Sequence, residues 1–146
     1  MEVVRELSKH GAKVDSADED GCTLLYVAAS NGHMEVVRQL LKLGAKVEGA
    51  DKSGVTPLST ACSNGHVEVV RELLKHGAKV LSANKFGLTP LKIATVKGHM
   101  EVVRELLKHG AKVQSANKFG LTTLKTATVK GHMEVVRELQ KNGARV

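Results

Sequence analysis

The stretch NKFGLTPLKIATVKGHMEVVRELLKHGAKV fills residues 84–113, and 33 residues later residues 117–146 read NKFGLTTLKTATVKGHMEVVRELQKNGARV. Positions in a compact enzyme lie in different surroundings and require different residues. Near-identity at a fixed period instead indicates surroundings that recur in space. The period therefore predicts a stack of similar structural units.

The whole chain follows the same period. It divides into a partial unit and four longer ones, which cover residues 1–20, 21–53, 54–86, 87–119 and 120–146. No linker or low-complexity segment separates these units. We therefore expect a single domain that spans residues 1–146.

Each unit begins with the signals of a short helix. In the unit 54–86, Thr56 can act as the N-cap, because its hydroxyl can accept a hydrogen bond from a backbone N–H of the first turn. Pro57 follows at the first helical position, where a missing N–H is tolerated. Gly65 is expected to end the helix, since glycine readily adopts the left-handed conformation beyond a helix end. The apolar face of this helix consists of Leu58, Ala61 and Cys62.

A second helix is expected from near His66 to Gly77. Its apolar residues at i, i+1, i+4 and i+5 form one stripe, which consists of Val69, Val70, Leu73 and Leu74. The opposite face is expected to point to solvent and to carry the ion pairs Glu68–Arg71 and Glu72–Lys75. Because isolated helices of this length are marginal in water, stacking against neighbouring units is expected to stabilise them.

Four features recur in one frame: Gly-x-Thr-Pro-Leu stretches at residues 54–58 and 87–91, Gly-His pairs, Val-Val-x-x-Leu helices and Gly-Ala-x-Val endings. With these features the chain resembles the ankyrin repeat family over essentially its whole length. The resemblance implies an all-α solenoid, a curved stack of helix–turn–helix units with β-turn fingers projecting from one edge. Where the family usually has histidine after Thr-Pro-Leu, this chain holds Tyr26, Ser59, Lys92 and Lys125.

Composition favours a globular protein. Hydrophobic residues make up 42% and aromatic residues 2% of the chain, which indicates a core of aliphatic side chains. No apolar run approaches the length of a membrane span, and no signal peptide is recognised. Cys22 and Cys62 lack a disulfide framework, which indicates free thiols in a reducing compartment. We therefore expect an intracellular protein, cytoplasmic or nuclear, without a membrane partner.

The histidines invite a metal hypothesis, but their spacing argues against it. His33, His66, His99 and His132 occupy one column of the repeat, so successive copies are expected roughly 10 Å apart, whereas zinc needs its nitrogen ligands at ~2.0–2.1 Å. We expect these residues to begin the second helices and to bond to local backbone. No carboxylate pair with a shared cleft and no phosphate-binding loop is recognised. The sequence thus predicts no catalytic site, no metal and no cofactor.

Charge is distributed unevenly along the chain. Residues 1–53 carry 7 Lys/Arg against 9 Asp/Glu, a net charge of −2, and residues 54–146 carry 15 against 6, a net charge of +9. Such a basic half is expected to attract acidic partners. The sequence therefore favours a protein partner with acidic and apolar groups.

Some positions of the repeat, here called columns, hold different residues in different units while the rest of the repeat stays constant. The resemblance places these variable columns at the finger tips and on the inner face of the first helices. They include Val55, Ser59, Ser63 and Asn84. Apolar anchors within a charged rim are typical of protein recognition. The partner-binding residues we predict from these columns are Tyr26, Lys52, Lys85, Phe86, Leu88, Lys92, Val96, Lys97, Lys118, Phe119, Leu121, Lys125, Val129 and Lys130.

Phe86 and Phe119 fall in the same column at the tips of adjacent fingers. Turns normally hold polar residues or glycine. The two rings either pack on the neighbouring finger or remain exposed as an apolar strip for a partner. The sequence leaves both alternatives open.

The principal interpretation is a monomeric, non-catalytic module that binds a protein through its concave face and finger tips. The alternative is an engineered, reconstructed or structural scaffold without a cellular partner. The chain begins in mid-repeat with a Met that other units carry internally, which a natural fragment or an engineered protein would explain. Nucleic-acid binding is a weaker alternative, because few aromatic residues are available for stacking and Lys/Arg alternates with Glu in the second helices.

Overall fold

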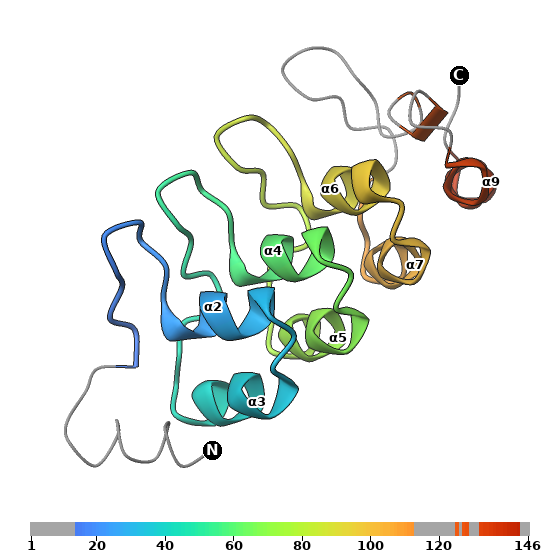
Figure 1. Cartoon of the computed structure of the whole chain (residues 1–146). Helices are drawn as coiled ribbons and strands as arrows, with labels where there is room; N and C mark the ends of the chain where they lie inside the picture. Colours follow the sequence, from blue (N-terminus) through green and yellow to red (C-terminus); the bar gives the residue numbers. More distant parts are fainter. Residues whose placement is uncertain (1–13, 113–124, 126, 129–131, 144–146) are drawn as a thin grey trace.

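The computed structural model describes residues 14–112, 125, 127–128 and 132–143. Helices follow one another in pairs along a stepped stack, with α2, α4 and α6 on the side that carries the projecting loops and α3, α5 and α7 on the other (Figure 1). The helices are α2 (Leu24–Ser30), α3 (Met34–Lys42), α4 (Pro57–Ser63), α5 (Val67–Lys75), α6 (Pro90–Lys97), α7 (Met100–Lys108) and α9 (Met133–Lys141). Within these residues the only β pairing is an isolated antiparallel bridge between Ala17 and Thr23. The predicted all-α solenoid is confirmed.

The first helix of each pair begins as the sequence predicts. The Thr56 hydroxyl accepts a hydrogen bond from the Ser59 backbone N–H at 3.1 Å, and Pro57 occupies the first turn of α4. Thr23 and Thr89 cap α2 and α6 in the same way. The three N-cap residues have nearly the same backbone angles, with φ of −86° to −84° and ψ of 163° to 169°, so these first helices begin in the same way.

Each finger is a β-turn closed by one side chain. The Gly54 N–H donates to the Asp51 carbonyl at 3.0 Å, while Asp51 Oδ1 accepts hydrogen bonds from the backbone N–H groups of Ser53 and Val55. Asp18 and Asn84 make equivalent bonds in their own turns. These three residues therefore shape their fingers, and the Oδ1 atom of each accepts hydrogen bonds within the molecule.

The core lies between the two layers of helices and continues from unit to unit. Each described first helix from α2 to α6 contributes a fully buried leucine, and each described second helix contributes another at a fixed position. These residues are Leu25, Leu58, Leu91, Leu40, Leu73, Leu106 and Leu139. Since every helix is shorter than the ~12–15 residues that fold alone, burial between neighbours supplies the stability.

The recurring histidines join successive units. His66 Nε2 lies 3.0 Å from the Ser30 carbonyl oxygen, and His99 Nε2 lies 3.0 Å from that of Ser63. Because a carbonyl only accepts, Nε2 carries the proton in each bond. His132 makes the same contact with Val96. The structural role is confirmed, but the expected local acceptor is wrong, because each ring reaches back to the preceding unit.

Glutamates of the second helices also join units. Arg71 Nη1 pairs with Glu68 at 2.7 Å, as predicted, but its Nε pairs with Glu105 of the next unit at 3.1 Å. Equivalent links join Arg38 to Glu72 and Arg104 to Glu138. The expectation that this glutamate column faces solvent is wrong, since the Glu72 and Glu105 side chains are only 13% and 10% exposed.

Glu72 departs from the sequence prediction in its partners as well. In place of the expected pair with Lys75, its carboxylate lies 3.0 Å from His76 Nε2 and 3.6 Å from Arg38 Nε. Burial raises the pKa of Glu72, but the hydrogen bond from His76 and the charges of Lys75 and Arg38 outweigh burial and hold the pKa below its ordinary value. The folded state therefore favours the ionised carboxylate.

We expect Glu72→Gln to lower the free energy of unfolding by ~1 kcal/mol at neutral pH and to have little effect near pH ~3. A pKa depressed by folding stabilises the protein above the unfolded-state pKa, and this stabilisation is lost as the pH falls through the folded-state pKa. Urea unfolding of both proteins at the two pH values measures the difference. An equal loss at both values would mean that the side chain acts through packing.

A third kind of connection between units is a hydrogen bond from a backbone N–H to an acidic side chain of the preceding unit, and one described unit lacks it. The Lys46 N–H donates to Asp15 Oδ1 at 2.8 Å, and one unit later the Lys79 N–H donates to Glu48 Oε2 at 3.1 Å. The next acceptor position holds Leu81, which is 47% exposed. Among the described residues, the backbone N–H of Lys112 has no hydrogen-bond acceptor.

Replacing Leu81 with glutamate should therefore raise the free energy of unfolding by ~1 kcal/mol, because it supplies the missing acceptor for the Lys112 N–H. Urea denaturation measures the gain. Leu81→Lys is the matched control, since it makes the same exposed site polar without adding an acceptor. A similar gain in both variants would attribute the effect to removal of exposed leucine alone.

Candidate functional site

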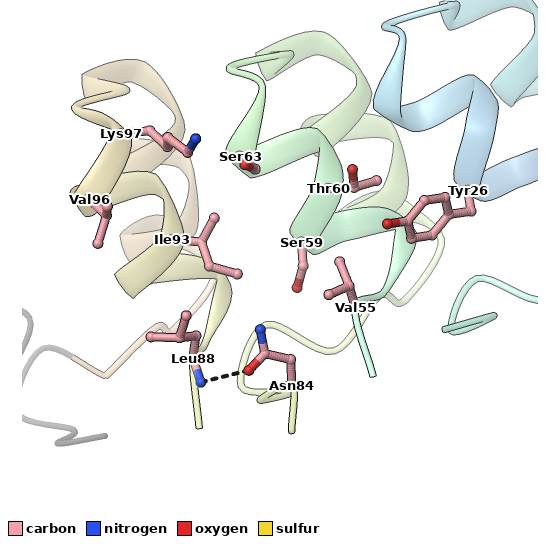
Figure 2. Close-up of a pocket in the computed structure, with 10 residues that line it drawn as sticks. All are labelled: Tyr26, Val55, Ser59, Thr60, Ser63, Asn84, Leu88, Ile93, Val96 and Lys97. Atoms are coloured by element: carbon pink, nitrogen blue, oxygen red, sulfur yellow. Dashed lines mark hydrogen bonds between the residues drawn. The ribbon is translucent and has the colours of Figure 1, made fainter. Parts of the chain in front are cut away.

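A groove of about 330 Å³ opens between the first helices and the fingers (Figure 2). Residues of α6 form one wall, and residues of α4 with the segment preceding it form the opposite wall. The lining consists of Tyr26, Val55, Ser59, Thr60, Ser63, Asn84, Leu88, Ile93, Val96 and Lys97. The groove thus draws on three successive units of the repeat.

The middle of the groove is apolar. Ile93 projects from α6 towards α4, and Leu88 lies below it where the finger meets the helix (Figure 2). Val55 lies on the opposite wall. All three side chains are half-buried, so each presents apolar surface to the groove. Covering such surface with a ligand is favourable by roughly 25 cal/mol per Å² of apolar area removed from water.

Tyr26 bounds one end of the groove. Its hydroxyl donates to Asp51 Oδ2 at 2.9 Å, which ties α2 to the finger that precedes α4. Burial, followed by the hydrogen bond and the charge of Asp51, raises the pKa of Tyr26 to about 12. The hydroxyl therefore keeps its proton at neutral pH and directs it to Asp51. Because Asp51 Oδ1 already accepts two backbone N–H groups, both carboxylate oxygens are engaged within the protein.

Asn84 supplies a donor at the base of the groove. Its Oδ1 accepts hydrogen bonds from the N–H groups of Phe86 and Leu88 at 2.8 and 3.1 Å, which fixes the orientation of the amide. The Nδ2 group points up into the groove (Figure 2). Asp18 and Asp51 hold the same position in the preceding fingers, where a carboxylate provides no donor.

Lys97 supplies a second donor at the opposite edge. Its side chain extends from the last turn of α6 towards Ser63 (Figure 2), and it is exposed. Within the described part of the chain no carboxylate lies within ion-pair distance of its ammonium. Among the lining residues Lys97 alone is formally charged.

The structure brings together four of the residues predicted from the sequence. Tyr26, Leu88, Val96 and Lys97 line the groove. Lys52 and Lys85 are exposed on the fingers outside it, and Lys125 is also exposed. Five further predicted residues lie outside the described part of the chain, and they are Lys118, Phe119, Leu121, Val129 and Lys130.

Lys92 requires a correction. We expected it to contact a partner, but its side chain is only 1% exposed. Burial lowers the pKa of its ammonium below the ordinary value for lysine. A lysine enclosed in this way is not available for direct contact with a partner. Its position in the repeat indicated where its backbone lies but not where its side chain ends.

Phe86 is 55% exposed at the tip of its finger. Phe86 is therefore largely accessible on its finger, and the adjacent Lys85 is exposed as well. Phe119, its equivalent in the next unit, lies outside the described residues. For Phe86, the exposed alternative agrees with the structure.

The sequence prediction omitted Ile93 and Thr60 from the binding residues. Both belong to one column, which holds Val27 in the preceding unit. The sequence signal that could have identified them is that this column holds different residues in successive units, whereas the rest of the repeat stays constant. Val55, Ser59, Ser63 and Asn84 lay in columns recognised as variable, but they were not selected as binding residues.

The described residues also bear on metal binding and on membrane insertion. They contain no group of three His, Cys, Asp or Glu side chains that could hold a metal ion. The described helices include none that is both long and apolar enough to cross a membrane.

The sequence model for ankyrin repeats, in three copies, matches residues 1–84 and 78–146. The chain belongs to the ankyrin repeat family. Comparison with curated proteins gives no match. Ankyrin repeats generally mediate protein–protein interactions and are typically non-enzymatic. In this ankyrin repeat protein the groove lies between the fingers and the first helices.

Proposed function

We propose that this ankyrin repeat protein is a monomeric, intracellular binding module that holds a segment of another protein in the groove between α4 and α6. The observation that carries the proposal is the composition of the groove. Half-buried Leu88 and Ile93 lie between two donors, Asn84 Nδ2 and the Lys97 ammonium. Apolar surface supplies affinity, and a few placed polar groups fix orientation.

The fingers extend the proposed contact surface. Phe86 and Lys85 are exposed on the finger that also provides Asn84 and Leu88. Large apolar side chains next to charged ones are common in interface cores and rims. A partner segment leaving the groove at this end passes directly over the finger.

The chemistry of the described residues supports a non-catalytic role. Burial raises the pKa of the Cys62 thiol, and a buried thiol is a poor nucleophile. The Tyr26 hydroxyl keeps its proton at neutral pH and donates it to Asp51. Neither group is arranged to attack a substrate in the groove.

Ion pairing of the second helices disfavours nucleic-acid binding. Arg38, Arg71 and Arg104 each pair with a glutamate of the same helix and with one of the next unit. Nucleic-acid binding gains from protein cations that neutralise phosphates and so release the counterions condensed on the nucleic acid. These arginines already neutralise carboxylates of the protein, so they add little to such binding.

Selection of a random 12-residue peptide library on the immobilised full-length protein tests the proposal. We expect enriched peptides to lose at least ~10-fold in affinity with Ile93→Asp, which places a charge in the apolar part of the groove. Leu43→Asp is the matched control, because Leu43 is an exposed apolar residue outside the groove lining. Failure to enrich peptides would favour the scaffold alternative, and equal losses in both variants would contradict the assigned groove.

A further inference from the structure

We infer that the groove selects an extended segment in which one large apolar side chain enters between Leu88 and Ile93 and a neighbouring aspartate or glutamate meets Lys97. This inference rests on the proposed function and names the chemistry of the partner. It follows from the charge of the lining, from the position of the two donors and from the shape of the apolar wall between them.

The charge of the lining is the first step. Lys97 is exposed, lies at the edge, and has no ion-pair partner within the described residues. The lining contains no carboxylate, and Asp51, which contacts the lining residue Tyr26, uses both oxygens within the protein. A ligand carboxylate therefore gains a cation, whereas a ligand ammonium would lose water without gaining a free acceptor of opposite charge.

The wider charge of the chain acts in the same direction. Residues 54–146 carry a net charge of +9, whereas residues 1–53 carry −2. α4 and α6, which form the walls of the groove, lie in the basic part. Long-range attraction raises the rate at which an acidic segment meets the protein, and salt weakens this attraction.

The two donors set the direction of the segment. Asn84 Nδ2 faces the groove at its finger end, and Lys97 lies at the opposite edge near Ser63 (Figure 2). A backbone carbonyl suits the neutral amide, and a carboxylate suits the ammonium, since charge-assisted bonds are the stronger ones. The apolar side chain then falls between them, against Leu88 and Ile93. In the preceding described fingers, Asp18 and Asp51 replace Asn84 and provide no such donor.

The inference is tested with the peptide that the wild-type protein enriches most strongly from the random library. Its acidic residues are replaced one at a time by the corresponding amides, and each peptide is titrated against the wild-type protein and Lys97→Met. We expect one replacement to weaken binding to the wild type by at least ~5-fold and to have less than ~2-fold effect on Lys97→Met. Lys52→Met is the matched control, since Lys52 is an exposed lysine outside the groove lining, and it should preserve the wild-type response.

Reselection of the library on Lys97→Glu provides a second measurement, in which the acidic preference should disappear and lysine or arginine should replace it. Thermal melting of each variant checks that the exposed substitution leaves the fold intact. If peptides require Ile93 but tolerate every acid-to-amide change, the proposed function stands and this inference is overturned. If the library gives no enriched peptide, both are overturned.

Discussion

Gly65→Ala should lower the free energy of unfolding by about 3 kcal/mol, a large effect for a single methyl group. Two causes add at this position. Gly65 has a φ of +74°, a conformation that costs other residues ~1–2 kcal/mol. An added Cβ would also lie 2.8 Å from the Nδ1 atom of His99, so the ring would have to move. Moving it breaks the 3.0 Å bond from His99 to the Ser63 carbonyl, which joins two units.

Gly77→Ala separates the two causes. Gly77 has a φ of +87°, but no atom lies within 4 Å of the position that its Cβ would occupy. This variant should therefore lose only the backbone contribution, ~1–2 kcal/mol. Urea unfolding of both variants measures the difference between them, which we assign to the histidine contact.

A further comparison tests the role of the ring itself. In a His99→Ala background the contact is absent, so Gly65→Ala should become as mild as Gly77→Ala. If Gly65→Ala and Gly77→Ala are equally destabilising in the wild-type background, the ring moves aside without loss. The glycine would then serve only the turn.

The same contact shows what sequence alone could predict. The recurrence of Gly-His at a fixed period correctly indicated structural histidines at the beginnings of second helices. The acceptor was not predictable, because it belongs to the preceding unit, 36 residues earlier in the chain. The repeat period and the local capping signals determine the secondary structure of each unit. The hydrogen bonds between units depend instead on how one unit is positioned against the next.

Lys92 and Glu105 illustrate the same limit. Both are charged residues in columns that sequence reasoning placed on exposed faces, and both are buried. Glu105 was misassigned because helix periodicity identifies the apolar stripe but not how far the next unit covers its margins. For Lys92 the sequence showed only a varying position, and variation does not distinguish an exposed side chain from an enclosed one.

The groove was predictable in part. Variation between repeats pointed to the finger tips and the inner face of the first helices, and Tyr26, Leu88, Val96 and Lys97 line the groove. Their role in binding stays a prediction. Ile93 was missed because an aliphatic residue in a helix is most simply interpreted as core. Its place in the groove follows from the pairing of α4 with α6, which no single unit contains.

Leu73→Ala should lower the free energy of unfolding by ~2–5 kcal/mol and should weaken the stack on both sides of the substituted unit. Leu73 is 0% exposed in α5, and α5 packs against α3 of the preceding unit and α7 of the following one. The main helix contacts join helices of the same or adjacent units. A cavity here therefore removes contacts from two interfaces, and in such an assembly stability is close to a sum of unit and interface contributions.

Urea unfolding and amide hydrogen exchange together check this expectation. Exchange should accelerate not only in α5 but also in α3 and α7, since these helices lose a packing neighbour. Leu81→Ala is the matched control, because it shortens a leucine of the same unit that is 47% exposed, and it should change stability by less than ~0.5 kcal/mol. Faster exchange confined to α5 would show that the units respond independently. In that case the histidine and arginine links between them would contribute less than their geometry indicates.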